Sequence, residues 1–582
     1  MLSLVLPACA GGGDAPKAAA AAGAEPVKVA SEPVAVPAPR KAPAITDCPA
    51  VLDRPEAGDR VIAGSCAPVT VRKGYRVESG SLTLEAGAQL AFEPGAELTV
   101  GYQQPGRLIV RGTAEKPVLM TSEGAKVKGS WRGVYLYDHA DGSEIVGLHI
   151  EYGGEGIRGP IYVLAEDVRI DHSEIRDCLD VPVHVSQKGR LSSFAGNTVL
   201  RPTSPVVMFV PPSSVPAIAD DNKFPEGSVI HVLTGIVRER VRWNNPGVPY
   251  SIGGLIEIAG EEEDAEALVE LSPGTVLRFD EDAYINVGYY RPGTLRAEGS
   301  AEHPIVFTAL GEPKPGAWRG VNLYKNASAS FSHVTFEYGS RRAEWGVLFA
   351  NSRAALAVSD CTFRHNGGGV VLQGGDLRIS EFARNKFTDL SAGVPVLDLS
   401  PQAYGSLGEG IELDKDATVI VEGGTVTRSA LWRDLGVPIE VTGPVAVEGA
   451  TLTIAAGVDL RVRDGFTLAV GEVDGGSLKV QGTAAAPVTI TGVNDRRGTW
   501  DAIRLFGRSR GNSLAQLLLR NAGGDAAVEV QGAADLAAEG LGCARCFAPT
   551  LTWSCESRVT QSAVSFAEGT PAGAVAPTGC GS

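Results

Sequence analysis

The chain has 582 residues and a formal charge of −16. This length exceeds that of one compact core, so it indicates either several domains or an elongated repeat. An acidic chain without a basic stripe argues against nucleic acid as a partner. No internal segment approaches the roughly 20 apolar residues of a membrane span.

The N-terminus carries a short apolar segment that ends at a cysteine. Leu6-Pro7-Ala8-Cys9 resembles the lipobox of bacterial lipoproteins, in which the signal peptide is cut before a cysteine whose thiol is lipidated. Residues 1–8 contain no basic residue and are interpreted as a truncated signal peptide; the alternative is an apolar N-terminus with a chance cysteine. The resemblance implies a lipid anchor at Cys9, and Ala10 after it implies the outer membrane.

Residues 9–47 follow as a stretch rich in alanine, proline and glycine. Residues 10–45 contain no aromatic side chain and cannot bury a core, which predicts a disordered tether. A cysteine, a tether and then a cysteine-bearing domain are typical of an anchored lipoprotein. We therefore expect a bacterial cell-envelope protein, periplasmic or surface-exposed, that contacts the membrane only through this anchor.

One block then occurs three times. The copies read GRLIVRGTAEKPVLMT at 106–121, GTLRAEGSAEHPIVFT at 293–308 and GSLKVQGTAAAPVTIT at 476–491. After a variable loop, each is followed by a short segment that begins with Trp131, Trp318 or Trp500; these tryptophans are 187 and 182 residues apart. The order and spacing predict three modules, at 48–225, 226–405 and 406–545, followed by a Cys-rich C-terminal cap at 546–582.

Within each copy, apolar residues alternate with polar ones over short runs, and Gly and Pro fall between the runs. This pattern predicts strands with one buried face and tight turns. Strand and turn repeating at about 20–25 residues per circuit is typical of a β-solenoid. The sequence thus predicts an all-β fold of about 20 coils.

The motifs also carry a family resemblance. The run LEAGAQLAFEPG at 84–95, the repeated block, the Gly-x-Trp segment, and LHIEYG at 148–153 resemble bacterial right-handed parallel β-helix proteins of the pectate-lyase-like superfamily. Copy two matches the last motif with VTFEYG at 334–339, and copy three diverges there. The resemblance covers roughly residues 48–550. It implies the fold; members range from polysaccharide lyases to non-catalytic surface proteins, so it leaves the function open.

Comparison of the copies separates structural from functional positions. Inward positions stay apolar, whereas outward ones change chemistry, as at Tyr135, Asn322 and Arg504. The shared Gly-x-Trp segment is therefore interpreted as a buried packing corner and not as a sugar platform. The repeated Glu-Tyr pair of copies one and two is interpreted as structural for the same reason.

A catalytic site confined to one copy is the alternative. Enzymes of this superfamily act on acidic sugars with clustered outward carboxylates that hold calcium, plus an Arg or Lys base. The best local candidates are Asp171, His172, Glu174, Arg176, Asp177, Asp180 and His184. Polar turns of a β-helix explain the same residues without chemistry, and we favour that interpretation. The acidic runs Glu261–Asp264 and Asp280–Asp282 are further candidates for calcium, although the first is typical of a solvated loop.

The nine cysteines lie mostly at the two ends of the folded region. We expect Cys48 to pair with Cys66, and Cys543, Cys546, Cys555 and Cys580 to form two disulfides of unassigned connectivity. The CxxC spacing of Cys543 and Cys546 leaves zinc as the alternative. Cys178 and Cys361 are expected to be buried small apolar residues.

The sequence therefore predicts an exported, lipid-anchored β-helix protein without a cofactor or a dedicated metal site, with calcium left open as a ligand of the acidic runs. We expect a non-catalytic structural or ligand-binding role, with polysaccharide or cell-surface components as partners. The alternative is a polysaccharide lyase or glycoside hydrolase on the same fold.

Overall fold

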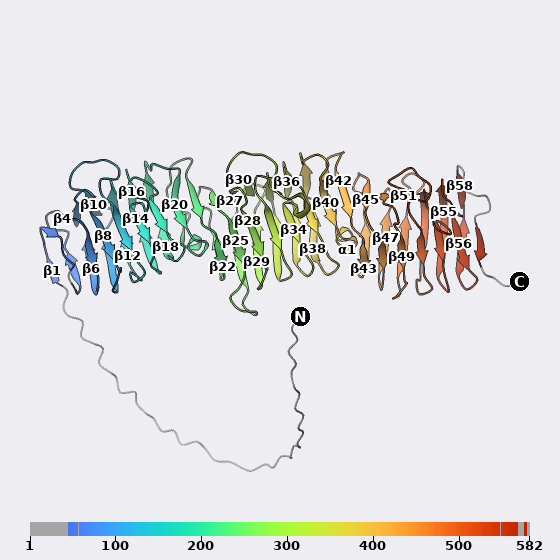
Figure 1. Ribbon diagram of the computed structural model, residues 1–582, viewed down its shortest axis with the longest axis horizontal. Helices are drawn as coiled ribbons and strands as arrows, with labels where there is room; N and C mark the ends of the chain where they lie inside the picture. The colour runs from blue at the N-terminus through green and yellow to red at the C-terminus, as the bar shows by residue number, and fades with distance from the viewer. Residues whose placement is uncertain (1–44, 56, 548, 568–574, 579–582) are drawn as a thin grey trace, which may run out of the picture. The chain divides into compact units, whose positions relative to one another are not determined.

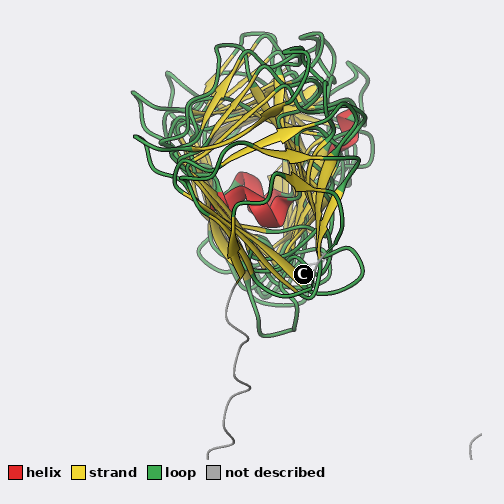
Figure 2. Ribbon diagram, turned by 90° about the vertical axis from the view of Figure 1, so that its left-hand side faces the viewer, coloured by secondary structure: helices red, strands yellow, loops and turns green. Residues whose placement is uncertain are grey.

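The computed structural model describes residues 45–578 apart from residues 56, 548 and 568–574. It contains 3% helix, and its strands form about 19 turns of parallel stacked coils (Figure 1). The all-β solenoid predicted from the repeat is thus confirmed. Viewed along the stack, the strands lie behind one another and the loops project outward (Figure 2). Residues 1–44, with Cys9 and most of the predicted tether, lie outside the described residues.

One coil of copy one shows how the sequence produces this architecture. Its strands are β9 (Gly106–Arg111), β10 (Val118–Ser122) and β11 (Gly133–Leu136). Each pairs in parallel with the equivalent strand of the coils before and after it, as β9 does with β6 (Gly80–Glu85) and β12 (Glu144–Val146). Leu108 and Val110 are fully buried between exposed Arg107 and Arg111, so the period of two places one face of each strand in the core.

The three copies use the same strand types in different sheets. The counterparts of β9, β10 and β11 are β29 (Gly293–Glu298), β30 (Ile305–Ala309) and β31 (Gly320–Leu323) in copy two, and β50 (Ser477–Gln481), β51 (Val488–Gly492) and β52 (Ile503–Leu505) in copy three. β10 belongs to a seven-stranded sheet, whereas β30 continues the 14-stranded sheet that contains β11, and β51 continues the 18-stranded sheet that contains β31. Equivalent outer surfaces of successive copies therefore face different directions around the axis.

Asparagines stack at the sharp corners between strands. Asn197 accepts a hydrogen bond from the backbone N–H of Ser173 (2.9 Å) and donates one to the carbonyl of Ile170 (2.8 Å). The residue before it, Gly196, has φ +64°, which turns the chain at the corner. These bonds satisfy backbone groups that the turn removes from the sheet.

The two isolated cysteines lie at the same kind of corner. Cys178 and Cys361 follow Asp177 and Asp360, whose φ angles are +51° and +56°. Both thiols are free and buried, as expected, and burial raises the pKa of each to about 12. Thiols held protonated in this way are unreactive.

The described coils extend beyond the predicted boundaries of the folded region. Strand β1 (Ile45–Asp47) already pairs with β3 (Arg60–Ile62). At the other end, β57 (Arg558–Ser562) and β58 (Ser565–Ala567) pair with β55 (Asp535–Ala544), and β59 (Val575–Thr578) pairs with β56 (Leu551–Ser554). The predicted C-terminal cap therefore contains further parallel coils. Within the described ranges, three short helices interrupt the strands: η1 (Pro212–Ala217), η2 (Ala343–Trp345) and α1 (Pro401–Tyr404).

Candidate functional site

The repeated tryptophans are buried corners, as the comparison of copies predicted. Trp131 and Trp318 are fully buried, and their rings stack on Phe92 and Phe279 with centroids 3.9 and 4.2 Å apart. Each indole N–H donates to the carbonyl of the Glu in the Glu-Tyr-Gly motif, at 2.9 Å. A side chain at the glycine of that motif would come within 3.2 Å of the Trp131 ring, so the glycine provides space for the indole.

The corner of copy three is less regular for two reasons. Val462 takes the place of the stacking phenylalanine, and Ala522 takes the place of the motif glycine. The Trp500 ring is accordingly tilted by 59° from Phe466, with centroids 6.2 Å apart, although its N–H still donates to the carbonyl of Arg520 (2.6 Å).

The candidate cluster of copy one is divided among several surfaces. Asp171 ends β15 (Val168–Asp171), whereas Glu174 and Arg176 lie on β16 (Glu174–Arg176) in a different sheet. His172, Asp177 and Asp180 have φ angles of +49°, +51° and +59° and form the turns. His184 lies on β17 (Val183–Val185) in a third sheet, in a ladder of rings between Tyr162 (5.2 Å) and Phe209 (5.3 Å).

Three carboxylates of this cluster, those of Asp171, Glu174 and Asp177, already have partners. Asp171 is buried and accepts hydrogen bonds from Ser193 Oγ (2.7 Å) and the backbone N–H of Ala195 (2.9 Å). Arg176 pairs with both Glu174 (2.8 Å) and Glu151 (2.9 Å). The Arg201 guanidinium beside Asp177 lowers the pKa of that carboxyl. These contacts give the cluster a structural role at the turns.

The acidic runs are likewise engaged with arginines. Asp282 lies 3.2 Å from both Arg319 and Arg341, and Glu263 lies 2.8 Å from Arg291. Among the described residues, no group of three His, Cys, Asp or Glu side chains is placed to hold a metal ion.

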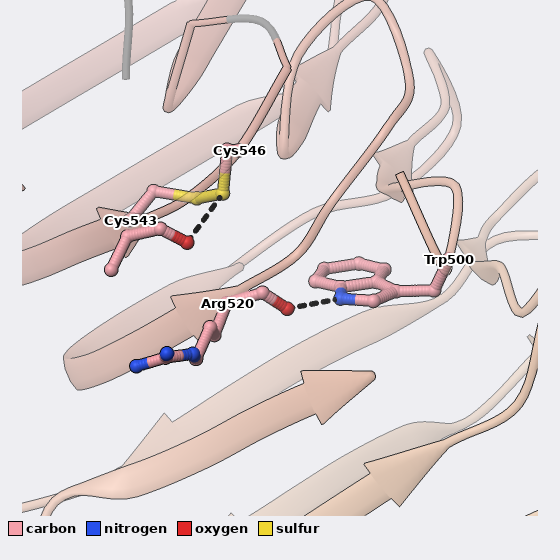
Figure 3. Close-up of a disulfide and its surroundings, with 5 residues drawn as sticks. Trp500, Arg520, Cys543 and Cys546 are labelled. Carbon is pink, nitrogen blue, oxygen red and sulfur yellow. Dashed lines mark hydrogen bonds between the residues drawn. A yellow bond between two sulfur atoms is a disulfide. The ribbon is translucent and has the colours of Figure 1, made fainter. Parts of the chain in front are cut away.

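The cysteines at the ends of the solenoid lie at disulfide distance. Cys48 and Cys66 are bonded, with Cα atoms 5.2 Å apart. Cys543 and Cys546 are bonded to each other, beside the Trp500 corner (Figure 3). Cys555 is disulfide-bonded as well, and Cys580 lies outside the described residues. The CxxC pair therefore has disulfide and not zinc geometry.

A cavity of about 370 Å³ lies on the outer surface of copy two. Its floor is formed by β25 (Leu255–Ile258), β28 (Tyr284–Val287) and β31, which lie side by side in one sheet. The outward residues Glu257, Asn286 and Asn322 occupy paired positions on these strands. All three are more than nine-tenths buried, which is unusual for outward polar groups.

Aromatic side chains form the walls of this cavity, which we call the copy-two groove. Tyr289, Tyr290 and Tyr324 follow the carboxyl ends of β28 and β31, and the Tyr289 ring lies 4.2 and 4.6 Å from the other two. Leu255, Tyr284, Arg319, Arg342 and Trp345 complete the lining at the opposite ends of the strands. Parallel strands bring their like ends together, so residues distant in sequence meet in two walls.

The tyrosine cluster also borders a second hollow of about 680 Å³. Besides Tyr289, Tyr290 and Tyr324, its lining comprises Lys325, Asn351, Ser352, Arg353 and Asp376. The two hollows thus share one aromatic wall. With Tyr290 at 74% exposure, this wall offers ring surface to a ligand on either side.

Electrostatics single out Glu257 on the groove floor. Its Oε1 has no hydrogen-bond partner among the described residues. Burial raises the pKa of Glu257, against the effect of hydrogen bonds from the Asn286 side chain and the Tyr289 backbone. An unpaired buried acceptor is costly, and such groups cluster at functional sites.

This groove is not among the sites predicted from the sequence, although the copies contain evidence for it. The residues before β29 read GYYRPG at 288–293, whereas the equivalent residues are GYQQPG at 101–106 and GEVDGG at 471–476. Tyr290 is therefore specific to copy two, like the outward Asn322.

No helix among the described residues is long and apolar enough to cross a membrane. No protein-family model and no curated protein matches the sequence.

Proposed function

We propose that this chain is an exported protein of the bacterial cell envelope that binds polysaccharide in the copy-two groove without cleaving it. The observation that supports this most is the combination of exposed tyrosine rings with a floor of buried amide and carboxylate groups. Aromatic rings pack on the C–H faces of sugars, and amides and carboxylates hydrogen-bond their hydroxyl groups. The core and corners are common to the copies, whereas this outer surface is not.

The chemistry of the lining supports binding over cleavage. Glycoside hydrolysis by the common route requires two carboxyl groups that flank the scissile bond. Glu257 is the one carboxylate among the described residues that line the 370 Å³ cavity. Arg319, a candidate base for a lyase, is held 3.2 Å from Asp282 and stacks on Tyr284 at 4.9 Å.

The shared tyrosine wall favours an extended ligand. A monosaccharide fills one hollow, whereas a chain that crosses Tyr290 contacts both. We therefore expect affinity to increase with the number of sugar units until both hollows are occupied.

Replacing Tyr290 with alanine tests the groove. We expect affinity for a polysaccharide that the wild type binds to fall at least tenfold, about 1.4 kcal/mol, because the most exposed ring of the wall is lost. Affinity electrophoresis in gels that contain soluble β-glucan, galactomannan or polygalacturonate measures this, and the unfolding curve should not change. Tyr102→Ala is the control, since Tyr102 is also exposed and lies in copy one. Unchanged binding by Tyr290→Ala would contradict the site, and shortened polysaccharide would indicate an enzyme.

The proposed anchoring at the outer membrane is tested separately at Cys9. The motif Leu6-Pro7-Ala8-Cys9 predicts that a palmitate analogue labels the protein when the gene is expressed with its upstream in-frame codons. Cys9→Ser should abolish the label and release the protein from the membrane fraction, because the lipid would be its membrane attachment. Cys361→Ser, at a buried corner, is the control and should retain the label.

A further inference from the structure

The floor of the copy-two groove is a directed row of hydrogen bonds. Asn322 Nδ2 donates to Asn286 Oδ1 at 3.0 Å, which leaves the Asn286 amide N–H₂ group to donate toward Glu257. Glu257 lies at the end of the row and is a pure acceptor when ionised. The row therefore ends in two acceptor oxygens at the floor of the cavity: Oε1 of Glu257, which is covered in the unliganded protein, and the side-chain oxygen of Asn322.

The unpaired Oε1 of Glu257 determines which ligand satisfies the floor. Glu257 is 7% exposed and lines the cavity, and its carboxylate has no arginine or lysine partner among the described residues. A ligand that donates a hydrogen bond relieves the cost of the unpaired acceptor. A ligand carboxylate or sulfate placed there adds like-charge repulsion, and a site built to bind a hydroxyl strongly rejects a ligand without one.

The surroundings also disfavour a cationic ligand. Arg319 and Arg342 line the same cavity and would repel an ammonium group. The Arg319 guanidinium already lies 4.9 Å from the centroid of the Tyr284 ring, so one aromatic face that could attract a cation is occupied. The ligand that meets both conditions is neutral and rich in hydroxyl groups.

We infer that the copy-two groove selects neutral saccharides, and that Glu257 enforces this selection by accepting hydrogen bonds from ligand hydroxyl groups. The inference rests on the proposed saccharide binding and adds the ligand class and the residue responsible. Tyrosine rings and the amides of Asn286 and Asn322 bind any sugar; Glu257 supplies the discrimination against acidic ones.

The test compares hexasaccharides of equal length by calorimetry on the full chain. The probes are the hexamers of glucose and mannose, the hexamer of galacturonate and the hexamer of glucosamine. We expect at least one neutral hexamer to bind ten times more tightly than either charged hexamer. Glu257→Gln, which keeps the side-chain volume, should weaken neutral binding about tenfold and reduce the discrimination against galacturonate.

Asp398→Asn is the matched control. Asp398 is a second outward carboxylate of the same sheet with an unpaired oxygen, but it does not line the groove. Its amide variant should bind every hexamer as the wild type does. Far-UV circular dichroism checks that each variant is folded.

Two other results would overturn the inference in distinguishable ways. Tighter binding of the galacturonate hexamer, lost in Arg342→Gln, would mean that the groove selects acidic saccharides; the proposed saccharide binding would then stand without the inference. An absence of binding by all hexamers would refute both.

Discussion

Replacing Trp131 with alanine should destabilise the coils of copy one by about 3–5 kcal/mol and leave copies two and three folded. The ring is fully buried, stacks on Phe92 at 3.9 Å and donates to the carbonyl of Glu151. Its removal leaves a cavity and an unpaired backbone carbonyl. Each coil contacts mainly its neighbours, so the loss should remain local.

Hydrogen exchange resolved by peptide measures this effect. Amides of copy one should exchange faster in Trp131→Ala, whereas those of copies two and three should not change. Trp345→Ala is the control, because Trp345 is a half-buried residue of the groove wall and its loss should affect binding more than exchange. Uniformly faster exchange along the whole chain would contradict a nearest-neighbour architecture, and no change at all would contradict the corner's role.

The same substitution in copy three should cost less. Trp500 lacks the parallel stacking partner of its counterparts and is tilted by 59° from Phe466, so fewer contacts disappear with the ring. The order of destabilisation expected is Trp131 and Trp318 first, then Trp500. This order would follow from Val462 and Ala522, two departures from the repeat that are visible in the sequence alone.

The fold was predictable because the information that determines it is local and repeated. Alternation such as Leu478, Lys479, Val480 fixes which face of a strand is buried, and three copies remove the ambiguity of one. The buried tryptophan corners followed from the same comparison. The turning of one copy relative to the next was not predictable, since the residues between the repeated blocks do not themselves repeat.

The groove was harder to predict because it depends on which outward residues are stacked. Glu257, Asn286 and Asn322 are 29 and 36 residues apart in sequence and become neighbours only through the register of three strands. Conversely, the polar residues between Asp171 and His184 are adjacent in sequence, but a coil that turns twice within that stretch places them on three sheets. Proximity in sequence is thus a poor guide to a site on a solenoid, whereas differences between copies at equivalent outward positions are a better one.

A half-buried carboxylate on the same sheet should make stability depend on pH. Asp398 lies on β40 (Pro395–Leu399), between Val371 and Ile420 on the adjacent strands β37 (Val370–Leu372) and β42 (Thr418–Val421). Its Oδ1 has no hydrogen-bond partner among the described residues. Burial, with a smaller contribution from Glu422, raises its pKa from 3.8 to about 6.

The sign follows from proton binding in the two states. Between about pH 4 and pH 6 the folded protein retains the Asp398 proton while the unfolded chain has lost it, so stability falls as the pH rises through this window. Below this pH window the carboxyl is protonated in both states. Above it the folded state bears the full cost of burying the ionised carboxylate. The penalty is at most about 3 kcal/mol, from 1.36 kcal/mol for each pKa unit, and the solvent around this half-buried group reduces it.

Asp398→Asn should therefore stabilise copy two above pH 6 and have little effect at pH 4, because an amide has no charge to bury. Urea unfolding followed by hydrogen exchange near β40, at pH 4, 5, 6 and 7, measures the difference between variant and wild type. Glu440→Gln is the control. Glu440 lies on β45 (Ile439–Val441) and is paired in register with Ile420 of β42, but its carboxylate forms an ion pair with Arg463 at 2.5 Å. This substitution should therefore be neutral or slightly destabilising. A wild-type stability near β40 that does not decline between pH 4 and 6 would mean that Asp398 is well solvated in the folded state and that the apolar neighbours do not exclude water from it.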